Sequence, residues 1–330
     1  MKNIYCTLFN HRYMSRGLAL FESLQRFDHK IELFIIAMDD IVYSKLAAEK
    51  IDHIVVIPIA DIEKENPRML TAKGNRSAAE YCWTCTPCVI RHILSHYDCD
   101  TCAYLDADIY FYQNPNILMS KMKDFLTMLI PHGSSEKERF REKRCGKYCV
   151  EFVPFKNQKQ SLEILNHWME QCLEWCYDEC EDGKFGDQKY LEEWENKDGV
   201  SITQDRGLGV APWNAGRFDL IKKEDASYDL IDLEDSMKRY KLFFYHYSQF
   251  KIFDKDVVCL DYSNRMIPDK FREELYVDYL KVIKEVNTKY HLTNDGIDYN
   301  CIEHFRSDDL DHLMHDRGYF RRSVLLTERD

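Results

Sequence analysis

The first hundred residues alternate between two hydrophobic periodicities, and this alternation restricts the possible folds more than any other feature of the chain. Apolar runs with the length of a strand occur at 4–9, 31–38, 53–59 and 101–105. Between them, apolar residues recur at helical spacing over 14–27, 40–49 and 78–96. Strands that alternate with helices build a mostly parallel sheet covered by helices. The sequence therefore predicts an α/β fold.

The second half of the chain follows no such alternation. Its aromatic and apolar runs predict strands at 148–155 and 242–247, helices at 162–177, 186–194 and 268–289, and a glycine-rich loop at 207–216. We expect one large domain over residues 1–262 and an extension, made of one helix and a charged tail, over residues 263–330.

The charge balance argues against a nucleic-acid-binding protein. The chain has 57 acidic and 45 basic residues, which gives a formal net charge of −12. A protein that binds nucleic acid neutralises the phosphates with lysine and arginine, so the opposite sign would be expected. A single nucleotide is still compatible with this charge, provided that a metal ion or a few basic groups offset its phosphates.

Location and redox state follow from the apolar runs and the cysteines. No run reaches the roughly 20 apolar residues that a membrane-spanning helix needs, and residues 1–9 have the pattern of a strand, without that of a signal peptide. Thirteen cysteines without an export signal indicate a reduced, cytoplasmic chain. Cys82, Cys85 and Cys88 have a spacing seen in zinc and iron–sulfur sites. They also fall on one expected helix among apolar residues, which favours buried thiols.

Two carboxylates follow the strand expected at 101–105. Asp106 and Asp108 are two residues apart, so both side chains lie on one face of an extended segment. Ligands of open α/β sheets collect at the carboxyl ends of the strands. A pair of carboxylates there suits a divalent cation, which can neutralise a departing nucleoside diphosphate. The alternative is a solvated turn, because the D-x-D spacing also occurs at 98/100, 254/256 and 309/311.

His246 lies within the otherwise apolar strand expected at 242–247. Taken alone, such a histidine is more often a core residue with satisfied hydrogen bonds. The alternative is a third metal ligand, since Mn²⁺ accepts imidazole beside carboxylates. Lys251 follows closely and is either a phosphate-binding charge or an ordinary surface lysine.

Two further pairs have both a structural and a binding interpretation. Asp187 opens the helix expected at 186–194, where aspartate is a favoured cap, but Asp187 and Gln188 also offer hydrogen-bond partners for sugar hydroxyls. Trp213 and Asn214, in the glycine-rich loop, either pack on a sugar or base ring or anchor the loop.

Arg76 precedes the helix expected at 78–96 and is placed to reach a phosphate or a carboxylate. Beside it, Ser77 and Glu80 have the spacing of a capping box. The chain lacks G-x-G-x-x-G, G-x-x-x-x-G-K-[ST] and G-x-S-x-G. These absences argue against Rossmann dehydrogenases, P-loop kinases and α/β-hydrolases.

In their order along the chain, these motifs resemble those of bacterial glycosyltransferases of the GT-A fold, nearest to the family 8-like nucleotide-diphospho-sugar transferases. The resemblance covers about residues 1–255. It rests on Tyr104-Leu105-Asp106-Ala107-Asp108, Gly186-Asp187-Gln188-Lys189-Tyr190-Leu191, the loop 210–214, and Tyr245-His246-Tyr247-Ser248-Gln249-Phe250-Lys251. The family's late motif usually reads H-x-x-G-x-x-K-P-W, whereas here the Gly, Pro and Trp are missing and the lysine is one residue closer.

The resemblance implies a GT-A fold, with a mostly parallel Rossmann-like sheet flanked by helices and a C-terminal helical extension. It implies that Asp106, Asp108 and His246 hold Mn²⁺ or Mg²⁺, and that Asp187 and Gln188 flank the reacting sugar as catalytic residues. The residues expected to bind the donor and its diphosphate are Asp106, Lys251, Arg76, Trp213 and Asn214.

The chain is therefore expected to be a metal-dependent, retaining glycosyltransferase. It would move a hexose or similar sugar from a UDP-sugar to a glycan or glycoconjugate. One alternative is a nucleotide-sugar hydrolase or nucleotidyltransferase of related fold, and the other is a non-catalytic sugar- or nucleotide-binding protein. The C-terminal run 317–322 holds three arginines beside two aromatic residues. It would allow peripheral contact with an anionic membrane surface, and the alternative is a solvated tail.

Overall fold

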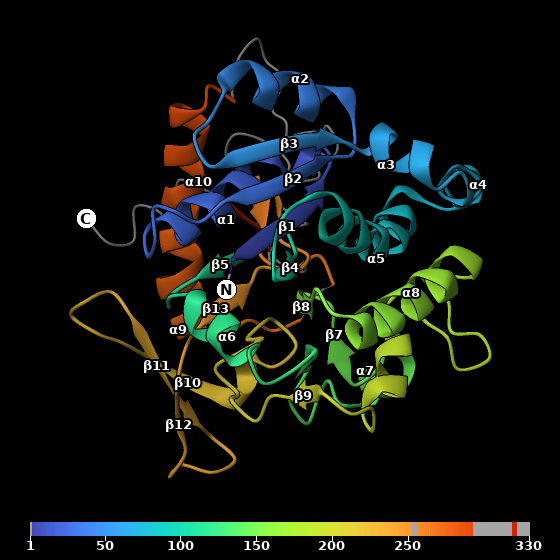
Figure 1. The fold of residues 1–330 in the computed structure, drawn as a ribbon. Coiled ribbons are helices and arrows are strands. Elements are labelled where there is room, and N and C mark those ends of the chain that lie inside the picture. The colour runs from blue at the N-terminus through green and yellow to red at the C-terminus, as the bar shows by residue number, and fades with distance from the viewer. Residues whose placement is uncertain (1, 253–256, 264, 293–318, 322–330) are drawn as a thin grey trace.

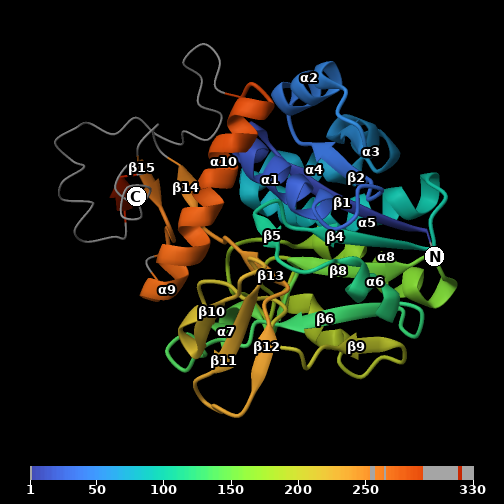
Figure 2. The same ribbon diagram turned by 90° about the vertical axis from the view of Figure 1, so that its left-hand side faces the viewer.

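The computed structural model describes residues 2–252, 257–263, 265–292 and 319–321, and two views of the ribbon show their arrangement (Figures 1 and 2).

A mixed sheet forms the centre of the molecule (Figure 1). The strand order is β3 (Ile54–Pro58), β2 (Leu33–Ala37), β1 (Asn3–Phe9), β4 (Thr101–Leu105), β8 (Phe152–Lys156), β6 (Thr127–Pro131) and β7 (Tyr148–Cys149), with β9 (Val200–Ile202) paired to β6. The first four of these strands are parallel, β8 runs against both β4 and β6, and β7 runs against β6. The expected α/β class with a mostly parallel sheet is confirmed.

Each face of the sheet has its own core and its own helices. One face is covered by α1 (Met14–Gln25), α2 (Asp40–Glu49) and α10 (Val277–Lys289); the other is covered by α3 (Ile59–Glu65), α4 (Arg68–Asn75), α5 (Ala78–His96) and α8 (Lys159–Glu174) (Figure 2). The side chains of β1 contribute to both cores, because successive side chains of a strand point to opposite faces of the sheet. Tyr5 and Phe9 join the first core, whereas Ile4, Cys6 and Leu8 join the second.

Helix α5 begins at the capping box that the sequence predicts. The hydroxyl of Ser77 accepts a hydrogen bond from the Glu80 N–H at 3.3 Å, and the Glu80 carboxylate accepts from the Ser77 N–H at 2.7 Å. Cys85 and Cys88 are buried in the core beneath this helix, and Cys82 is half-buried. The prediction of buried thiols is confirmed for Cys85 and Cys88 and not for Cys82, and the described residues that could hold a metal ion do not include these three.

The strand expected at 148–155 is two strands. β7 pairs with β6 and β8 pairs with β4, so the chain has to change partners between them. The break falls at Val150 and Glu151. It places Glu151 directly opposite the end of β4, where its carbonyl accepts from the Asp106 N–H at 2.9 Å.

The sequence patterns predict no element between residues 217 and 241, yet a three-stranded antiparallel sheet lies there. It consists of β10 (Phe218–Lys222), β11 (Tyr228–Asp232) and β12 (Arg239–Lys241), and it stands out below the central sheet (Figure 1). Strand β6, the helices α3, α4, α6 (Asn116–Lys121) and α7 (Phe140–Cys145), and the strand β9 were likewise not predicted. These are short elements, and their apolar runs hold too few residues to set a period.

The helix expected at 268–289 is present as α9 (Asp269–Phe271), a π-helical turn (Arg272–Tyr276) and α10. Helix α10 lies beside α1, and both belong to one core (Figure 2). Its Tyr279 stacks on Tyr247 with ring centroids 3.7 Å apart. The strands β14 (Lys251–Ile252), β15 (Val257–Cys259) and β16 (Tyr319–Arg321) form a separate small sheet. The division of the chain at residue 262 stays a prediction.

Candidate active site

The two aspartates at the end of β4 lie in a tight turn. The chain leaves the sheet after Leu105, and the Ile109 N–H returns to the Asp106 carbonyl at 3.3 Å. The Tyr104 hydroxyl donates to Asp106 Oδ1 at 3.0 Å, which fixes that carboxylate. The Asp106 side chain is 30% exposed and the Asp108 side chain 10% exposed. The turn thus presents two carboxylates at the carboxyl end of a buried parallel strand.

His246 reaches the same turn from a distant part of the chain. Strand β13 (Phe244–His246) pairs with β5 (Ile109–Phe111), with His246 opposite Ile109, and the Tyr247 N–H donates to the Asp108 carbonyl at 2.8 Å. The imidazole Nε2 lies 3.1 Å from Asp108 Oδ1 and 3.7 Å from Asp106 Oδ2. The structure therefore brings together all three residues that the sequence suggests as metal ligands.

Glu151 completes this group, although the sequence patterns did not single it out. Its Oε2 lies 2.8 Å from Nδ1 of His246, and its side chain is only 1% exposed. A carboxylate accepts, so Nδ1 donates its proton to Glu151, and Nε2 is the ring nitrogen that faces the aspartates. Carboxylate–histidine pairs of this kind orient the histidines that bind metals. A lone acid in the apolar run at 148–155 was the one signal that could have found it.

A close approach of backbone holds Glu151 in place. Gly209 has a φ of +70°, and a Cβ at that position would lie 2.4 Å from Glu151 Oε1 and 2.7 Å from Ile130 Cγ2. Any side chain at residue 209 would displace the glutamate, and L-residues disfavour this φ. The glycine-rich loop therefore packs directly against Glu151 and limits where its carboxylate can lie.

The charges of the group influence one another. Burial alone would lower the pKa of His246, but the carboxylates of Asp108 and Glu151 hold it well above its usual value. Burial, opposed by His246 and reinforced by the other carboxylates, raises the pKa of Asp106 to about 6. For Asp108 the attraction of His246 outweighs burial and lowers the pKa. Three acids against one imidazole leave a site that attracts a cation.

A cavity of about 820 Å³ opens above this group. Its lining includes Asp106, Asp108 and His246, and also Asp187, Gln188, Trp213 and Lys251. The N-terminal half of α5 forms one wall through Ala78, Ala79, Cys82, Trp83 and Thr86. The volume falls within the range of small-molecule sites, which hold a few convergent polar groups in a concave pocket.

Asp187 and Gln188 lie on the wall of the cavity, just before a 3₁₀ helix (Lys189–Trp194). Asp187 is buried, and its burial, with the charge of Asp106, raises its pKa well above the usual value. The Gln188 amide nitrogen donates to the Cys145 carbonyl at 2.7 Å, which fixes the plane of the carboxamide.

Trp213 and Asn214 differ in their access to the cavity. The Trp213 ring lines it and packs edge-on against the His246 ring at 5.3 Å between centroids. Asn214 faces the loop: its amide nitrogen donates to the carbonyls of His132 at 2.7 Å and Gly209 at 2.8 Å, and its oxygen accepts from the Ala211 N–H. Asn214 therefore anchors the loop that carries Trp213.

The two basic residues of the expected donor site lie in different places. Lys251 lines the cavity, and its ammonium lies 3.2 Å from the Tyr13 hydroxyl. Arg76 is absent from the lining of the cavity. It donates to the Thr84 hydroxyl at 2.8 Å and to the Leu173 carbonyl at 3.1 Å, and so joins α5 to the end of α8.

The remaining D-x-D pairs and the basic tail lie elsewhere. Asp98 and Asp100 contact Lys2 before the start of β4, at the opposite end of the strand from Asp106. The pairs 254/256 and 309/311 lie outside the described residues. Residues 317, 318 and 322 of the run suggested for membrane contact do so as well, and 319–321 are described only as the backbone strand β16. Among the described helices, none combines the length and the apolar character that crossing a bilayer requires.

The chain is similar to two proteins of Bacillus subtilis (strain 168), and no protein-family model matches it. It is 29% identical to the uncharacterized protein YfnF over 297 residues, which cover 87% of this chain and 95% of YfnF. It is 26% identical to the uncharacterized protein YfnD over 284 residues, which cover 85% of this chain and 88% of YfnD.

Several solved glycosyltransferases are similar to the chain in structure. The galactosyltransferase LgtC, in complex with donor and acceptor sugar analogs, superposes with a TM-score of 0.44 and 15% identity, covering 64% of this chain and 76% of LgtC. Mouse xyloside xylosyltransferase 1 superposes with a TM-score of 0.43 and 11% identity, covering 64% and 87%. The mannosyltransferase Ktr4p from S. cerevisiae gives 0.39 and 8%, covering 61% and 68%.

Proposed function

We propose that this chain is a metal-dependent glycosyltransferase that takes a sugar from a nucleotide-sugar, with UDP as the expected nucleotide. The observation that carries the proposal is the convergence of Asp106, Asp108 and His246 at the base of a cavity of about 820 Å³. The ligand atoms of these three residues lie within 4.8 Å of one another. The same residues belong to the motifs whose order resembles that of the GT-A transferases.

The residues fit a divalent metal ion such as Mn²⁺ or Mg²⁺. Two carboxylates with one imidazole form a ligand set that Mn²⁺ accepts, and Glu151 already fixes the tautomer that leaves Nε2 available. A bound ion at Asp106, Asp108 and His246 would neutralise the diphosphate of the leaving nucleotide.

The side chains around the cavity have distinct tasks in this proposal. Lys251, on the lining, supplies a positive charge for the diphosphate. Trp213 offers an apolar edge to a sugar or base ring. Asp187 and Gln188 flank the reacting sugar, where Gln188 is held in a fixed orientation by the Cys145 carbonyl. From the resemblance to the family 8-like transferases, we propose transfer with retention of configuration, to a glycan or glycoconjugate acceptor.

Calorimetric titration of UDP and of GDP, each with Mn²⁺ and with EDTA, tests the donor site. We expect UDP to bind in Mn²⁺, and the binding to disappear in EDTA and in Asp108→Ala. The matched control is Asp100→Ala, which removes an aspartate of the same spacing that contacts Lys2 outside the cavity. It should bind UDP like the wild type. If neither nucleotide binds in any condition, the proposal is wrong.

Turnover of UDP-sugars then separates transfer from the alternative activities. Release of UDP that needs a carbohydrate acceptor supports a transferase. Equal release without an acceptor would indicate a nucleotide-sugar hydrolase. Metal-dependent UDP affinity without turnover of any donor would indicate a protein that only binds the nucleotide-sugar.

A further inference from the structure

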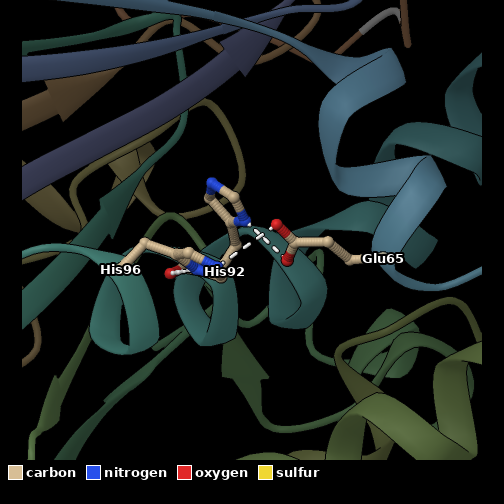
Figure 3. A group of neighbouring side chains, drawn as sticks. All are labelled: Glu65, His92 and His96. Carbon is tan, nitrogen blue, oxygen red and sulfur yellow. Dashed lines mark hydrogen bonds and ion pairs between the residues drawn. The ribbon is translucent and has the colours of Figure 1, made fainter.

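A second cluster of imidazole and carboxylate groups lies where the end of α3 meets the C-terminal half of α5 (Figure 3). Glu65 is the last residue of α3, and His92 and His96 are one helical turn apart on α5. None of the three lines the cavity described above. Residues four apart on a helix share a face, so both rings are presented to the same glutamate.

The three side chains converge on one point. Glu65 Oε2 lies 3.0 Å from Nδ1 of His92, and Glu65 Oε1 lies 3.3 Å from Nε2 of His96 (Figure 3). The two imidazole rings stack with centroids 4.4 Å apart and an interplanar angle of 23°. One ligand atom from each residue lies within 4.8 Å of the other two.

The hydrogen bonds of His96 show what this point requires. Its Nδ1 lies 3.0 Å from the His92 carbonyl, which can only accept, so Nδ1 carries a proton. In the neutral ring, Nε2 then directs a lone pair at a carboxylate oxygen. That approach is repulsive unless a cation lies between them, and the cation is either a second proton on His96 or a metal ion.

The distance from each imidazole to the carboxylate is close to the ligand spacing of a tetrahedral zinc site. Bonds from Zn²⁺ to imidazole nitrogen and carboxylate oxygen are about 2.0–2.2 Å long, so neighbouring ligand atoms of a tetrahedron lie about 3.3–3.5 Å apart. The nitrogen-to-oxygen separations are 3.0 Å for His92 and 3.3 Å for His96, each to a different oxygen of Glu65, so each imidazole separately lies near this spacing from the carboxylate. Two imidazoles and one carboxylate are a ligand set that Zn²⁺ uses, with water at the fourth position.

We propose that Glu65, His92 and His96 form a second metal site, which takes Zn²⁺ or a similar late transition metal. With two imidazoles it prefers softer ions than the group of two carboxylates and one imidazole at the cavity. His92 is mostly buried, with 8% of its side chain exposed, whereas Glu65 and His96 are about half exposed, so the ion can enter from solvent.

The site joins two helices that are separated in the chain by α4. A bound ion would fix the end of α3 to the C-terminal half of α5. The N-terminal half of α5 forms a wall of the cavity. The second site therefore stabilises the helix that shapes this wall, and it does so whatever reaction the cavity supports.

Zinc titration of the full chain, in competition with a chromogenic zinc chelator, tests the proposal. We expect the wild type to bind one more Zn²⁺ per chain than His96→Ala. Glu65→Gln, which keeps both imidazoles, should weaken the same binding at least tenfold. At a hundredfold excess of Zn²⁺ over its Kd, the rise in Tm should be about 4 °C larger for the wild type than for His96→Ala.

His167→Ala is the matched control. His167 is an exposed histidine, 3.4 Å from a Glu193 oxygen, and it has no second imidazole beside that carboxylate among the described residues. This variant should bind Zn²⁺ like the wild type. Because Zn²⁺ can also enter the group around Asp108, the comparison is repeated in Asp108→Ala, where adding His96→Ala should still remove one bound Zn²⁺.

Equal zinc stoichiometry and affinity in the wild type and His96→Ala would overturn the proposal. So would a difference that vanishes in the Asp108→Ala background, since the lost ion would then belong to the cavity. Circular dichroism of the metal-free variants shows whether they fold, and Glu65→Gln supplies the answer if His96→Ala does not. UDP binding in Mn²⁺ reports on the cavity separately, so either proposal can fail alone.

Discussion

Replacing Glu151 by glutamine should weaken metal-dependent binding of UDP without changing any residue that touches the ion. The carboxylate of Glu151 is 2.8 Å from Nδ1 of His246 and almost completely buried. The amide of glutamine has the same shape and can still accept from Nδ1. The substitution removes the negative charge that makes Nε2 of His246 a stronger ligand, and it holds the imidazole ring less firmly in its orientation.

The size of this effect can be estimated because Glu151 hydrogen-bonds to His246, a proposed metal ligand, and is not itself a proposed ligand. Loss of a carboxylate that orients a metal-binding histidine typically costs 10–100-fold in metal affinity, or about 1.4–2.8 kcal/mol. A loss of stability is expected too, since Glu151 Oε1 has no hydrogen-bond partner among the described residues. An amide nitrogen there would be buried without an acceptor, which costs about 1–3 kcal/mol.

Two measurements separate the two effects. Calorimetry gives the affinity for UDP at fixed Mn²⁺, and urea denaturation in EDTA gives the stability of the metal-free chain. The matched control is Glu63→Gln, because Glu63 is also buried and its Oε1 accepts from Tyr81 at 2.7 Å and from Lys73 at 2.8 Å, away from the cavity. It should lose stability and keep its affinity for UDP. If Glu151→Gln also keeps the affinity of the wild type, then Glu151 does not position His246.

Three other substitutions test the surrounding framework. Ser77→Ala removes the cap of α5 and should lower the free energy of unfolding by about 1 kcal/mol in urea denaturation. Asp232→Asn breaks a buried ion pair with Arg217 at 3.0 Å and should cost about 3 kcal/mol at pH 7. Arg217 outweighs burial and lowers the pKa of Asp232, so this contribution exists above the carboxyl's unfolded pKa; the gap between the two chains should close as the pH falls through the folded pKa. Gly209→Ala should push the carboxylate behind the site histidine out of place and reduce both stability and UDP affinity, whereas Gly216→Ala, where a Cβ meets nothing within 4 Å, should leave the affinity unchanged.

The elements that could be predicted are those whose buried residues recur in the sequence at the spacing of a strand or a helix. Strand β2 is buried along its whole length, so it is apolar throughout, and α2 and α5 have the bounds that the sequence predicts. The strands β10 and β11 were not predicted, although their residues alternate between buried and more exposed positions. Each alternation covers only five residues and has isoleucine as well as aspartate at its outward positions, so the period is too short and too weak to predict a strand.

Local patterns predicted the part of the candidate site that one strand end supplies, the resemblance in motif order suggested His246, and neither predicted Glu151. Asp106 and Asp108 follow from the position of β4. His246 joins them only because β13 pairs with β5, and no local pattern predicts that pairing. Glu151 depends on the break between β7 and β8, which appears only when both pairings are known. Arg76 shows the reverse, since a basic residue beside a helix start satisfied neighbouring backbone and hydroxyl groups instead of a ligand.

The C-terminal helices pack against the side of β13 that faces away from the aspartates, and so help to hold His246 in place. Along β13 and just beyond it, side chains alternate, so His246 faces the aspartates while Tyr245 and Tyr247 face the opposite way. There the Tyr247 hydroxyl donates to the Leu275 carbonyl at 3.0 Å, and the Tyr245 ring packs on Tyr276. The strand is therefore held from both sides: Glu151 and the glycine-rich loop act on one side, and the residues that precede α10 act on the other. A chain that ended at residue 262 would keep every proposed metal ligand, yet it would expose the aromatic side of the strand that carries one of them. The C-terminal helices thus support the strand that carries His246, although no residue of α9 or α10 lines the cavity.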